Sequence, residues 1–288
     1  MLGGSGFLGR HLIAELARRG MWVSVPSRRR ERAKHLIVLP TVEVLEEDIH
    51  APRTLERLLS GCDAVVNLVG TLAERDFERL HAQLPAQIAS ACRASGVRRF
   101  LHVSALGAAP DAPSAYQRSK ARGEEAVLGA ASVDATVFRP SVVFGPEDRF
   151  LNLFARLARL MPVLALACPQ ARFQPVYVGD VALALAESLD EPEAHGKRYD
   201  LCGPHDYTLE GLVRFACAAS GYRRLVIGLP PGLSYLQAWV LEHLPGRLMT
   251  RDNVRSMQVP NVCAAGCTLP FGLPARALEA IAPAYLQA

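Results

Sequence analysis

Short apolar runs alternate with amphipathic segments through the first half of the chain. The runs are typical of buried strands, whereas the segments between them repeat apolar residues at helical spacing. We therefore expect strands at 21–26, 41–46, 63–68, 98–103 and 133–138, and helices at 7–19, 51–60, 76–95 and 115–130. Alternation of this kind predicts an α/β fold with a doubly wound parallel sheet.

The pattern changes after residue 143, where prolines become frequent. Helices are predicted at 149–160, 180–189, 208–219, 233–244 and 250–257, and short strands at 173–178, 198–202 and 224–228. We expect one domain over 1–143 and a smaller one over 144–288. Later elements should return to the first sheet, so that the two domains interleave.

A glycine-rich turn precedes the first helix, with glycines spaced three residues apart. Such a turn lets backbone N–H groups approach a pyrophosphate at a helix N-terminus, as in Rossmann-like dinucleotide-binding domains. The predicted pyrophosphate contacts are Gly3, Ser5, Gly6, Phe7, Leu8 and Gly9.

The strand that should precede this turn is very short in the sequence. Only Met1 and Leu2 are present, whereas a strand usually has ~5–6 residues. Either the first strand is truncated to a stub or the natural chain begins further upstream, and we expect the second.

The residues after the strand at 21–26 bear on the choice of cofactor. An acidic residue here holds the ribose 2′-hydroxyl of NAD, whereas an arginine meets the 2′-phosphate of NADP. Ser27 and Arg28 stand at this point, and no carboxylate occurs until Glu31. The pattern favours NADP(H) over NAD(H), with Arg28 as the contact; the alternative is a solvated basic helix start.

Two further strand ends are predicted to lie beside the dinucleotide. Asp48 and Ile49 follow the strand at 41–46, where an acid can bind the adenine. Asp48 could instead cap the following helix. The strand at 63–68 ends in another predicted contact segment, formed by Leu68, Val69 and Gly70.

Tyr116 and Lys120 are the strongest catalytic candidates. Residues four apart share one face of a helix, and a nearby ammonium lowers the pKa of a tyrosine. Tyr116 can then exchange a proton with a carbonyl or hydroxyl while hydride moves to or from a nicotinamide. Ser104 ends the strand at 98–103 and is placed to hold the substrate oxygen. The alternative for Tyr116 and Lys120 is an exposed helix pair.

Composition adds few constraints. The chain has 288 residues and a net charge of +4, from 32 basic and 28 acidic residues. This balance does not indicate nucleic-acid binding. Seven scattered cysteines suggest reduced thiols in a reducing compartment, and no metal site is evident. No run of residues has the length of a membrane span or the pattern of a signal peptide, so we expect a cytoplasmic location.

Together, the glycine turn, Ser104, Tyr116 and Lys120 resemble the extended branch of the short-chain dehydrogenase/reductase superfamily, which includes epimerases and dehydratases. The segments at 139–146 and 174–182 resemble that branch too. The likeness implies cofactor contacts at Pro140, Val142 and Val143. It also implies a substrate lying against 141–178, near Phe144, Phe173 and Tyr177.

The segments at 144–152 and 250–254 more closely resemble the nucleotide-binding accessory subunit of respiratory complex I and its bacterial relatives. The likeness implies tightly bound NADPH and a structural or regulatory role; other relatives are linked to coenzyme Q synthesis. Three hypotheses follow. The first is an NADP(H)-dependent oxidoreductase, the second is a non-catalytic assembly or regulatory subunit, and the third is a nucleotide-sugar epimerase or dehydratase.

One later segment repeats apolar residues at helical spacing. Leu233, Leu236, Val240 and Leu244 share one face of the helix at 233–244, beside Tyr235 and Trp239. This face packs on the core, or it meets a protein or a membrane surface through 230–245. In the second case the protein would sit peripherally at the inner membrane.

Overall fold

A parallel sheet organises the N-terminal part of the computed structural model, which describes residues 1–51, 53–131 and 133–287. Four strands lie in the order β10-β5-β4-β3, all parallel. Their bounds are β3 (Ala64–Asn67), β4 (Arg99–Val103), β5 (Asp134–Pro140) and β10 (Arg198–Leu201). A second parallel pair joins β1 (Val23–Ser27) and β2 (Val42–Glu46). The expected doubly wound α/β fold is confirmed.

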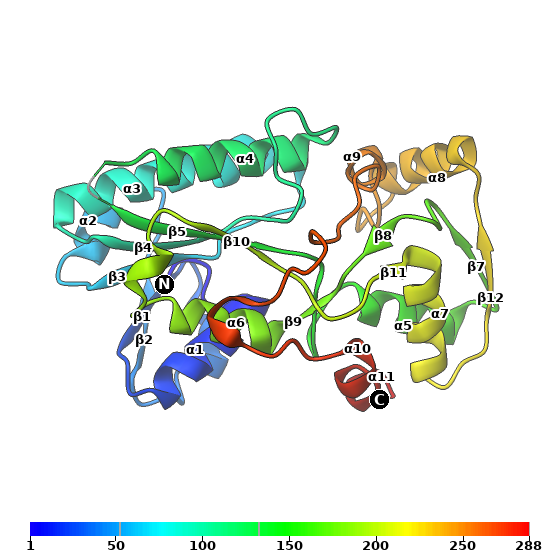
Figure 1. The fold of residues 1–288 in the computed structure, drawn as a ribbon, viewed down its shortest axis with the longest axis horizontal. Coiled ribbons are helices and arrows are strands. Elements are labelled where there is room, and N and C mark those ends of the chain that lie inside the picture. The colour runs from blue at the N-terminus through cyan, green and yellow to red at the C-terminus, as the bar shows by residue number, and fades with distance from the viewer. Residues whose placement is uncertain (52, 132, 288) are drawn as a thin grey trace.

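Helices cover both faces of this sheet (Figure 1). On one face, α1 (Phe7–Arg18) packs against α6 (Val178–Glu187). On the other lie α2 (Thr54–Leu59), α3 (Leu84–Ser95) and α4 (Ala115–Leu128). Each face has its own apolar core, centred on Leu12, Ile13 and Leu185 on the α1 side and on Leu84, Ile88 and Phe100 on the α3 side. Burial on both faces explains why the strand sequences are nearly continuous apolar runs.

Met1 and Leu2 precede the glycine turn and contact the sheet. Leu2 makes one parallel bridge with Asn67, with its N–H donating to Val66 O (2.9 Å) and its carbonyl accepting from Leu68 N (2.9 Å). The Met1 α-amino group donates to Ser24 O (2.6 Å). Beyond these contacts, a cavity of about 570 Å³ separates β1 from β3 and is lined by residues of both strands.

The C-terminal part forms a smaller layered unit at the right of Figure 1. Its helices are α5 (Leu151–Leu160), α7 (Leu209–Ala219), α8 (Pro231–His243), α9 (Arg251–Ser256), α10 (Leu278–Ile281) and α11 (Pro283–Leu286). Its strands pair two by two: β6 (Val143–Phe144) with β9 (Val176–Tyr177), β8 (Arg172–Phe173) with β11 (Tyr207–Thr208), and β7 (Val163–Leu166) with β12 (Leu225–Gly228). Although β10 lies late in the chain, it pairs with β5 in the main sheet. The division at residue 143 stays a prediction.

Three local features differ from the sequence expectations. The predicted strand at 173–178 is two short strands, β8 and β9, and β7 was not predicted because Pro162 interrupts its apolar run. The predicted helix at 76–95 begins as a 3₁₀ turn (Glu74–Asp76) and a π-helix (Glu78–Gln83) before α3. A further 3₁₀ segment (Arg30–Leu36) follows β1.

The cysteines differ as well. Cys202 and Cys263 form a disulfide, so the expectation of seven reduced thiols is wrong for this pair. They stand 61 residues apart in the sequence, and no short spacing marks them as partners. The chain fold brings them together beside Leu106.

Candidate active site

The glycine turn has the geometry of a phosphate-binding loop. Gly3 has φ +78°, and a Cβ there would lie 2.9 Å from the carbonyl carbon of Leu68. A Cβ on Gly9 would lie 2.3 Å from Gly4 O, so only glycine lets α1 approach the turn this closely. Gly6 is the N-cap of α1, and none of the described side chains caps this helix end. The open end, flanked by Ser5, Phe7 and Leu8, therefore fits a pyrophosphate.

The predicted adenosine contacts meet around His50. Burial lowers the pKa of His50, Arg79 and Arg28 lower it further, and Asp48 raises it. Arg28 and Asp48 therefore lie close enough to influence the same ring, with Ile49 between Asp48 and His50 in the chain. The Asp48 carboxylate accepts the N–H of His50 (3.1 Å) and so stabilises its own turn. The sequence left Asp48 as an alternative cap of the following helix, but this helix begins only at Thr54.

The segment after β3 joins the glycine turn to the catalytic candidates. Val69 N donates to the Asn67 side chain (3.1 Å), and the backbone of Leu68 and Val69 contacts Gly3. A Cβ on Gly70 would lie 3.6 Å from Lys120 Nζ. Leu68, Val69 and Gly70 thus lie between the turn and Lys120, and their contact with a dinucleotide stays a prediction.

Ser104 and Lys120 lie at the carboxyl end of β4. Lys120 is buried in α4 and donates to Val103 O (3.1 Å), the residue before Ser104. Tyr116 is half-buried one turn earlier in the same helix. The Ser104 hydroxyl is buried and has no hydrogen-bond partner within the part of the chain that the structure describes. A ligand oxygen would complete its hydrogen bonding.

The electrostatics of this group differ from the sequence expectation. Burial raises the pKa of Tyr116 to about 12, so the expected lowering is wrong. Burial also lowers the pKa of Lys120 to about 8, with Glu124 opposing the shift. Desolvation is the largest cause of both shifts, because it disfavours the charged form of each group.

Asp252 of α9 holds the start of α4 in place. Its carboxylate accepts the backbone N–H of Ala115 (2.8 Å) and of Tyr116 (3.0 Å). The carboxylate thus binds two open N–H groups of a helix N-terminus, where negative charge is stabilised. Sequence reasoning singled out the segment 250–254 but missed this contact, because Asp252 and Tyr116 are 136 residues apart in the sequence.

His81 is a second site residue that sequence reasoning missed. Its Nε2 accepts the N–H of Thr71 (3.0 Å), so its Nδ1 carries the proton and donates to Ser119 Oγ (2.9 Å). The Ser119 hydroxyl donates in turn to Tyr116 O (2.7 Å). His81 also packs edge-on against the Tyr116 ring. It therefore ties the loop after Gly70 to the helix that carries Tyr116 and Lys120.

His81 should make folding stability depend on pH. Burial, with Lys120 adding to it, lowers the pKa of His81 from 6.5 to about 3. Below pH 6.5 the unfolded chain binds a proton that the folded protein does not, so stability falls as pH falls. Between about pH 7.5 and pH 5 we expect His81 to account for a loss of roughly 2 kcal/mol.

Urea unfolding at the two pH values measures this loss. His81→Asn should remove roughly 2 kcal/mol of the pH difference, whatever its effect at neutral pH. His205→Asn, at an exposed histidine, is the matched control and should keep the wild-type difference. An unchanged difference in His81→Asn would contradict the assignment.

The substrate side is only partly as predicted. Phe144 is 1% exposed and packs in a core with Leu151, and its role as a substrate contact stays a prediction. Phe173 and Tyr177 are half-buried against the same core. Two described cavities, of about 360 Å³ between α1 and α6 and about 570 Å³ between β1 and β3, do not include Tyr116.

Asn261 positions the segment implied to meet the nicotinamide. Its side-chain oxygen accepts the N–H of Val142 (3.0 Å) and the hydroxyl of Ser141 (2.6 Å). Pro140 is buried, whereas Val142 and Val143 are half-buried. A residue near the C-terminus therefore fixes a loop of the main sheet, and no local sequence pattern signals this.

No cluster of His, Cys, Asp or Glu among the described residues has the arrangement of a metal site. None of the helices formed by these residues is long and apolar enough to cross a bilayer.

Known proteins resemble this chain over most of its length. Residues 1–202 match the family described as the NAD dependent epimerase/dehydratase family. The chain is 33% identical over 282 residues to mitochondrial NADH dehydrogenase (ubiquinone) 1 alpha subcomplex subunit 9 of Rattus norvegicus, covering 92% of this chain and 72% of that one. It is 33% identical over 246 residues to ceramide reductase of Caulobacter vibrioides, covering 82% and 76%.

A solved structure shares the fold. A dTDP-glucose 4,6-dehydratase of Streptomyces venezuelae, DesIV, superposes with a TM-score of 0.67 at 20% identity. The match covers 89% of this chain and 94% of that one.

Proposed function

Because the chain belongs to the NAD dependent epimerase/dehydratase family, we propose that it is an NADP(H)-dependent oxidoreductase that interconverts a carbonyl and a hydroxyl group. The family supports a nicotinamide dinucleotide as cofactor, and the glycine turn fits its pyrophosphate. Ser104, Tyr116 and Lys120 are the proposed catalytic residues.

The unpartnered Ser104 hydroxyl carries this proposal. A buried polar group without a partner costs about 1–3 kcal/mol, so such groups are rare unless a ligand completes them. Ser104 lies at the carboxyl end of a central parallel strand, where ligands bind in doubly wound folds. The side chains of Tyr116 and Lys120 come from the helix that follows this strand.

The three side chains have distinct roles in the proposed reaction. The bound nicotinamide supplies or accepts a hydride. Ser104 donates a hydrogen bond to the substrate oxygen and holds it. In reduction, the Tyr116 hydroxyl gives its proton to that oxygen, and in oxidation the tyrosinate takes it back. The Lys120 ammonium stabilises the tyrosinate, and burial makes this charge more effective than it would be in water.

Arg28 supports NADP(H) as the preferred cofactor. It is exposed directly after β1, in the region that also holds Asp48 and His50. A guanidinium binds a phosphate through paired hydrogen bonds, whereas a carboxylate here would repel it. The neighbouring Ser27 hydroxyl donates to Arg29 O (3.0 Å) and so shapes the turn.

Turnover with lipid carbonyl compounds tests the proposal. One relative is named for reducing ceramide, so we propose long-chain ketones as the first substrates, dispersed in detergent and followed by loss of NADPH fluorescence. We expect at least one ketone to be reduced and Ser104→Ala to be ~10-fold or more slower, since one oxyanion donor is lost. Absence of turnover across ketones and alcohols would contradict the proposal.

A non-catalytic assembly or regulatory subunit is the second candidate. Its support is the similarity to a named subunit of NADH dehydrogenase and the exposed apolar helix α8. This role requires the nucleotide to be held but not turned over. Tight NADPH binding with no turnover would favour it. For either role we propose a cytoplasmic location. A nucleotide-sugar epimerase or dehydratase has weaker support, because the likeness to DesIV shows the fold alone.

A further inference from the structure

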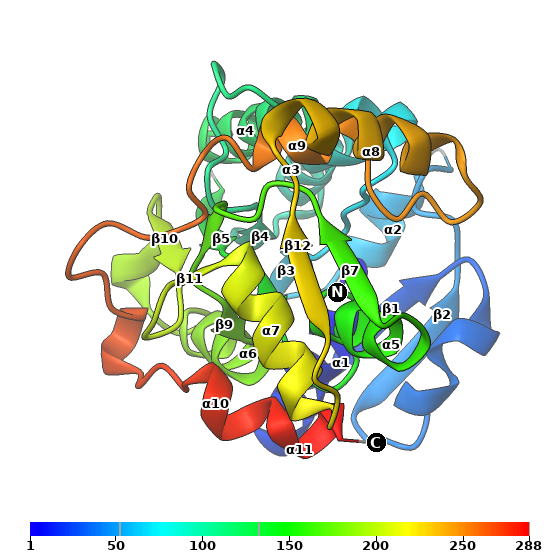
Figure 2. The same cartoon turned by 90° about the vertical axis from the view of Figure 1, so that its right-hand side faces the viewer.

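An apolar surface closes the end of the molecule farthest from the glycine turn. In the β7–β12 pair, Leu164 and Val226 face the core, while their neighbours Val163, Leu225 and Ile227 are exposed. A strand with one solvated face normally carries polar residues there. Figure 2 shows this ribbon facing outward, with α8 above it.

Helix α8 extends this surface. Leu233, Leu236 and Val240 are 51%, 53% and 43% exposed on one side, while Ser234 and Ala238 on the opposite side are buried. Two hydrogen bonds join α8 to β7 and to the turn after it. Gln237 donates to Ala165 O (2.9 Å), and Cys168 N donates to Ser234 Oγ (3.1 Å). We call the exposed set the apolar end: Val163, Leu225, Ile227, Leu233, Leu236 and Val240.

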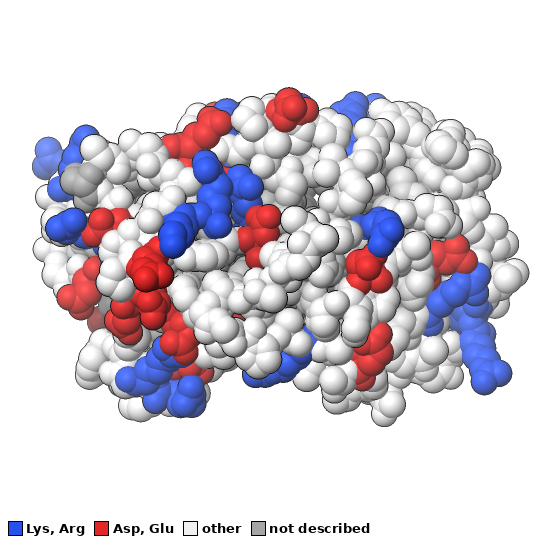
Figure 3. Space-filling model, viewed as in Figure 1, with Lys and Arg blue, Asp and Glu red and all other residues white. Residues whose placement is uncertain are grey.

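Arginines are the unpaired charges that flank the apolar end, and the nearby Glu210 is paired with Arg214, which donates to Val226 O of β12. Exposed arginines adjoin each of its segments: Arg159 lies before β7, Arg223 before β12 and Arg247 after α8. Between residues 222 and 250 the only acid is Glu242, and it is bonded to Arg251 (3.0 Å). In Figure 3 the surface over α8, at upper right, carries no charged residue. An apolar face with a cationic rim is complementary to an anionic lipid surface.

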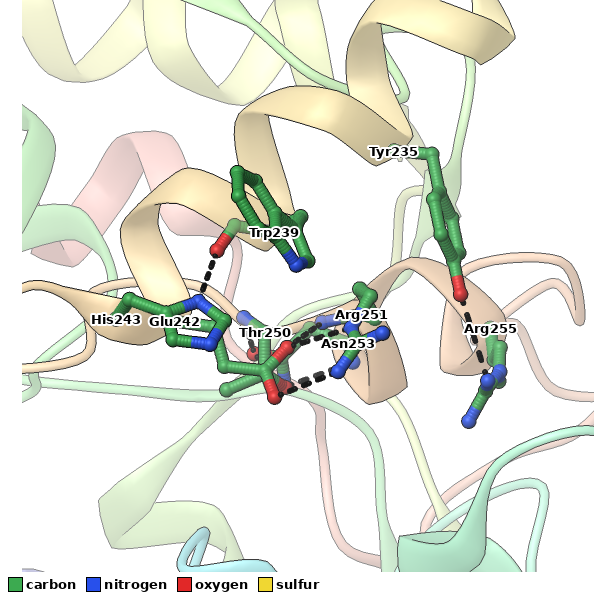
Figure 4. A network of polar contacts seen from close by, with 8 residues as sticks. All are labelled: Tyr235, Trp239, Glu242, His243, Thr250, Arg251, Asn253 and Arg255. Atoms are coloured by element: carbon green, nitrogen blue, oxygen red, sulfur yellow. Dashed lines mark hydrogen bonds and ion pairs between the residues drawn. The ribbon is translucent and has the colours of Figure 1, made fainter.

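Aromatic side chains border the same helix face. Trp239 is 48% and Tyr235 40% exposed, and Figure 4 shows both projecting from α8 toward α9. The Tyr235 hydroxyl accepts from Arg255 (3.4 Å). Aromatic rings with a polar end are favoured at the boundary between headgroups and acyl chains.

The apolar end is connected to the candidate active site. Arg251 bonds Glu242 of α8 through its backbone N–H (3.2 Å) and its guanidinium (Figure 4). The next residue, Asp252, accepts the N–H groups of Ala115 and Tyr116. Two adjacent residues of α9 thus join α8 to α4, the helix that carries Tyr116.

We propose that the apolar end is a docking surface for a bilayer that contains anionic lipids, on which the protein sits peripherally. This goes beyond the proposed oxidoreductase activity and does not depend on turnover. Leucines of α8 and the β7–β12 ribbon enter the headgroup region, and the flanking arginines pair with lipid phosphates.

Co-sedimentation with vesicles tests the docking. The wild-type chain should bind phosphatidylglycerol-containing vesicles at least ~10-fold more tightly than pure phosphatidylcholine vesicles, and added salt should weaken it. Leu236→Gln/Val240→Gln should lose at least ~10-fold in affinity for the anionic vesicles. Ile37→Gln/Val38→Gln is the matched control, because it removes two exposed apolar residues elsewhere and should bind as wild type.

Tryptophan fluorescence gives an independent signal. The chain has two tryptophans, so Trp22→Phe leaves Trp239 as the single reporter. Its emission should shift to shorter wavelength on anionic vesicles. Equal binding of the α8 double variant would overturn the proposal. A second result would also overturn it: the wild type does not bind vesicles and forms a dimer, and the α8 double variant dissociates that dimer. The apolar end would then be an interface between copies.

Discussion

Tyr116→Phe is expected to reduce kcat by about 10²- to 10⁴-fold, the range typical for loss of a positioned proton donor. The substitution removes only the hydroxyl. The ring contacts with Phe77 and His81 remain, as do the backbone bonds to Asp252. Steady-state reduction of a responsive ketone by NADPH measures the effect. The melting temperature and the Kd for NADPH should stay close to wild type.

Tyr222→Phe provides the matched control, since Tyr222 is a half-buried tyrosine in the C-terminal unit. It should turn over at the wild-type rate. A Tyr116→Phe enzyme that retains full turnover would remove Tyr116 from the chemistry. If both variants are slow, a general loss of packing explains the result and the assignment to Tyr116 fails.

Gly9→Ala is expected to have the largest effect on stability. The new methyl group would lie 2.3 Å from Gly4 O and 2.6 Å from Gly4 Cα, and neither backbone atom can move without opening the turn. Overpacking of this kind costs about 3 kcal/mol. Because α1 must shift away from the turn, the affinity for NADPH should also fall by ~10-fold or more. Urea unfolding and NADPH titration measure the two effects.

Gly232→Ala is the corresponding control. Gly232 lies in α8, and a Cβ there would meet nothing within 4 Å. In a helix, alanine is more favourable than glycine by roughly 1 kcal/mol, so this variant should be as stable as wild type or slightly more stable. Equal stability of Gly9→Ala and wild type would show that α1 does not pack on the turn as described.

The sequence was sufficient for the N-terminal fold because its signals are local. Strands buried on both faces read as apolar runs, and α1 and α4 fall within one or two residues of the predicted helices at 7–19 and 115–130. The glycine turn was predictable for the same reason. Short strands such as β8 and β9 were not, because a pair of two-residue strands leaves no periodicity to detect.

Long-range contacts account for most of what sequence reasoning missed in the site. Asp252, Asn261 and His81 each act on residues in distant segments, and the Cys202–Cys263 pair is equally non-local. The packing of Phe144 against Leu151 was not predictable either, because an aromatic residue after a strand can point to a ligand or to the core. The pKa of Tyr116 depends on burial, which the spacing of Tyr116 and Lys120 does not reveal.

Titration of the wild-type chain and Arg28→Ala with NADPH and NADH, followed by fluorescence, tests the central claim most directly. The account predicts that the wild type binds NADPH at least ~10-fold more tightly than NADH, a difference of ~1.4 kcal/mol. Arg28→Ala should lose this preference while binding NADH as before. Failure of the wild type to bind either dinucleotide would contradict the account, because the glycine turn, Ser104 and Tyr116 would then have no cofactor to act with.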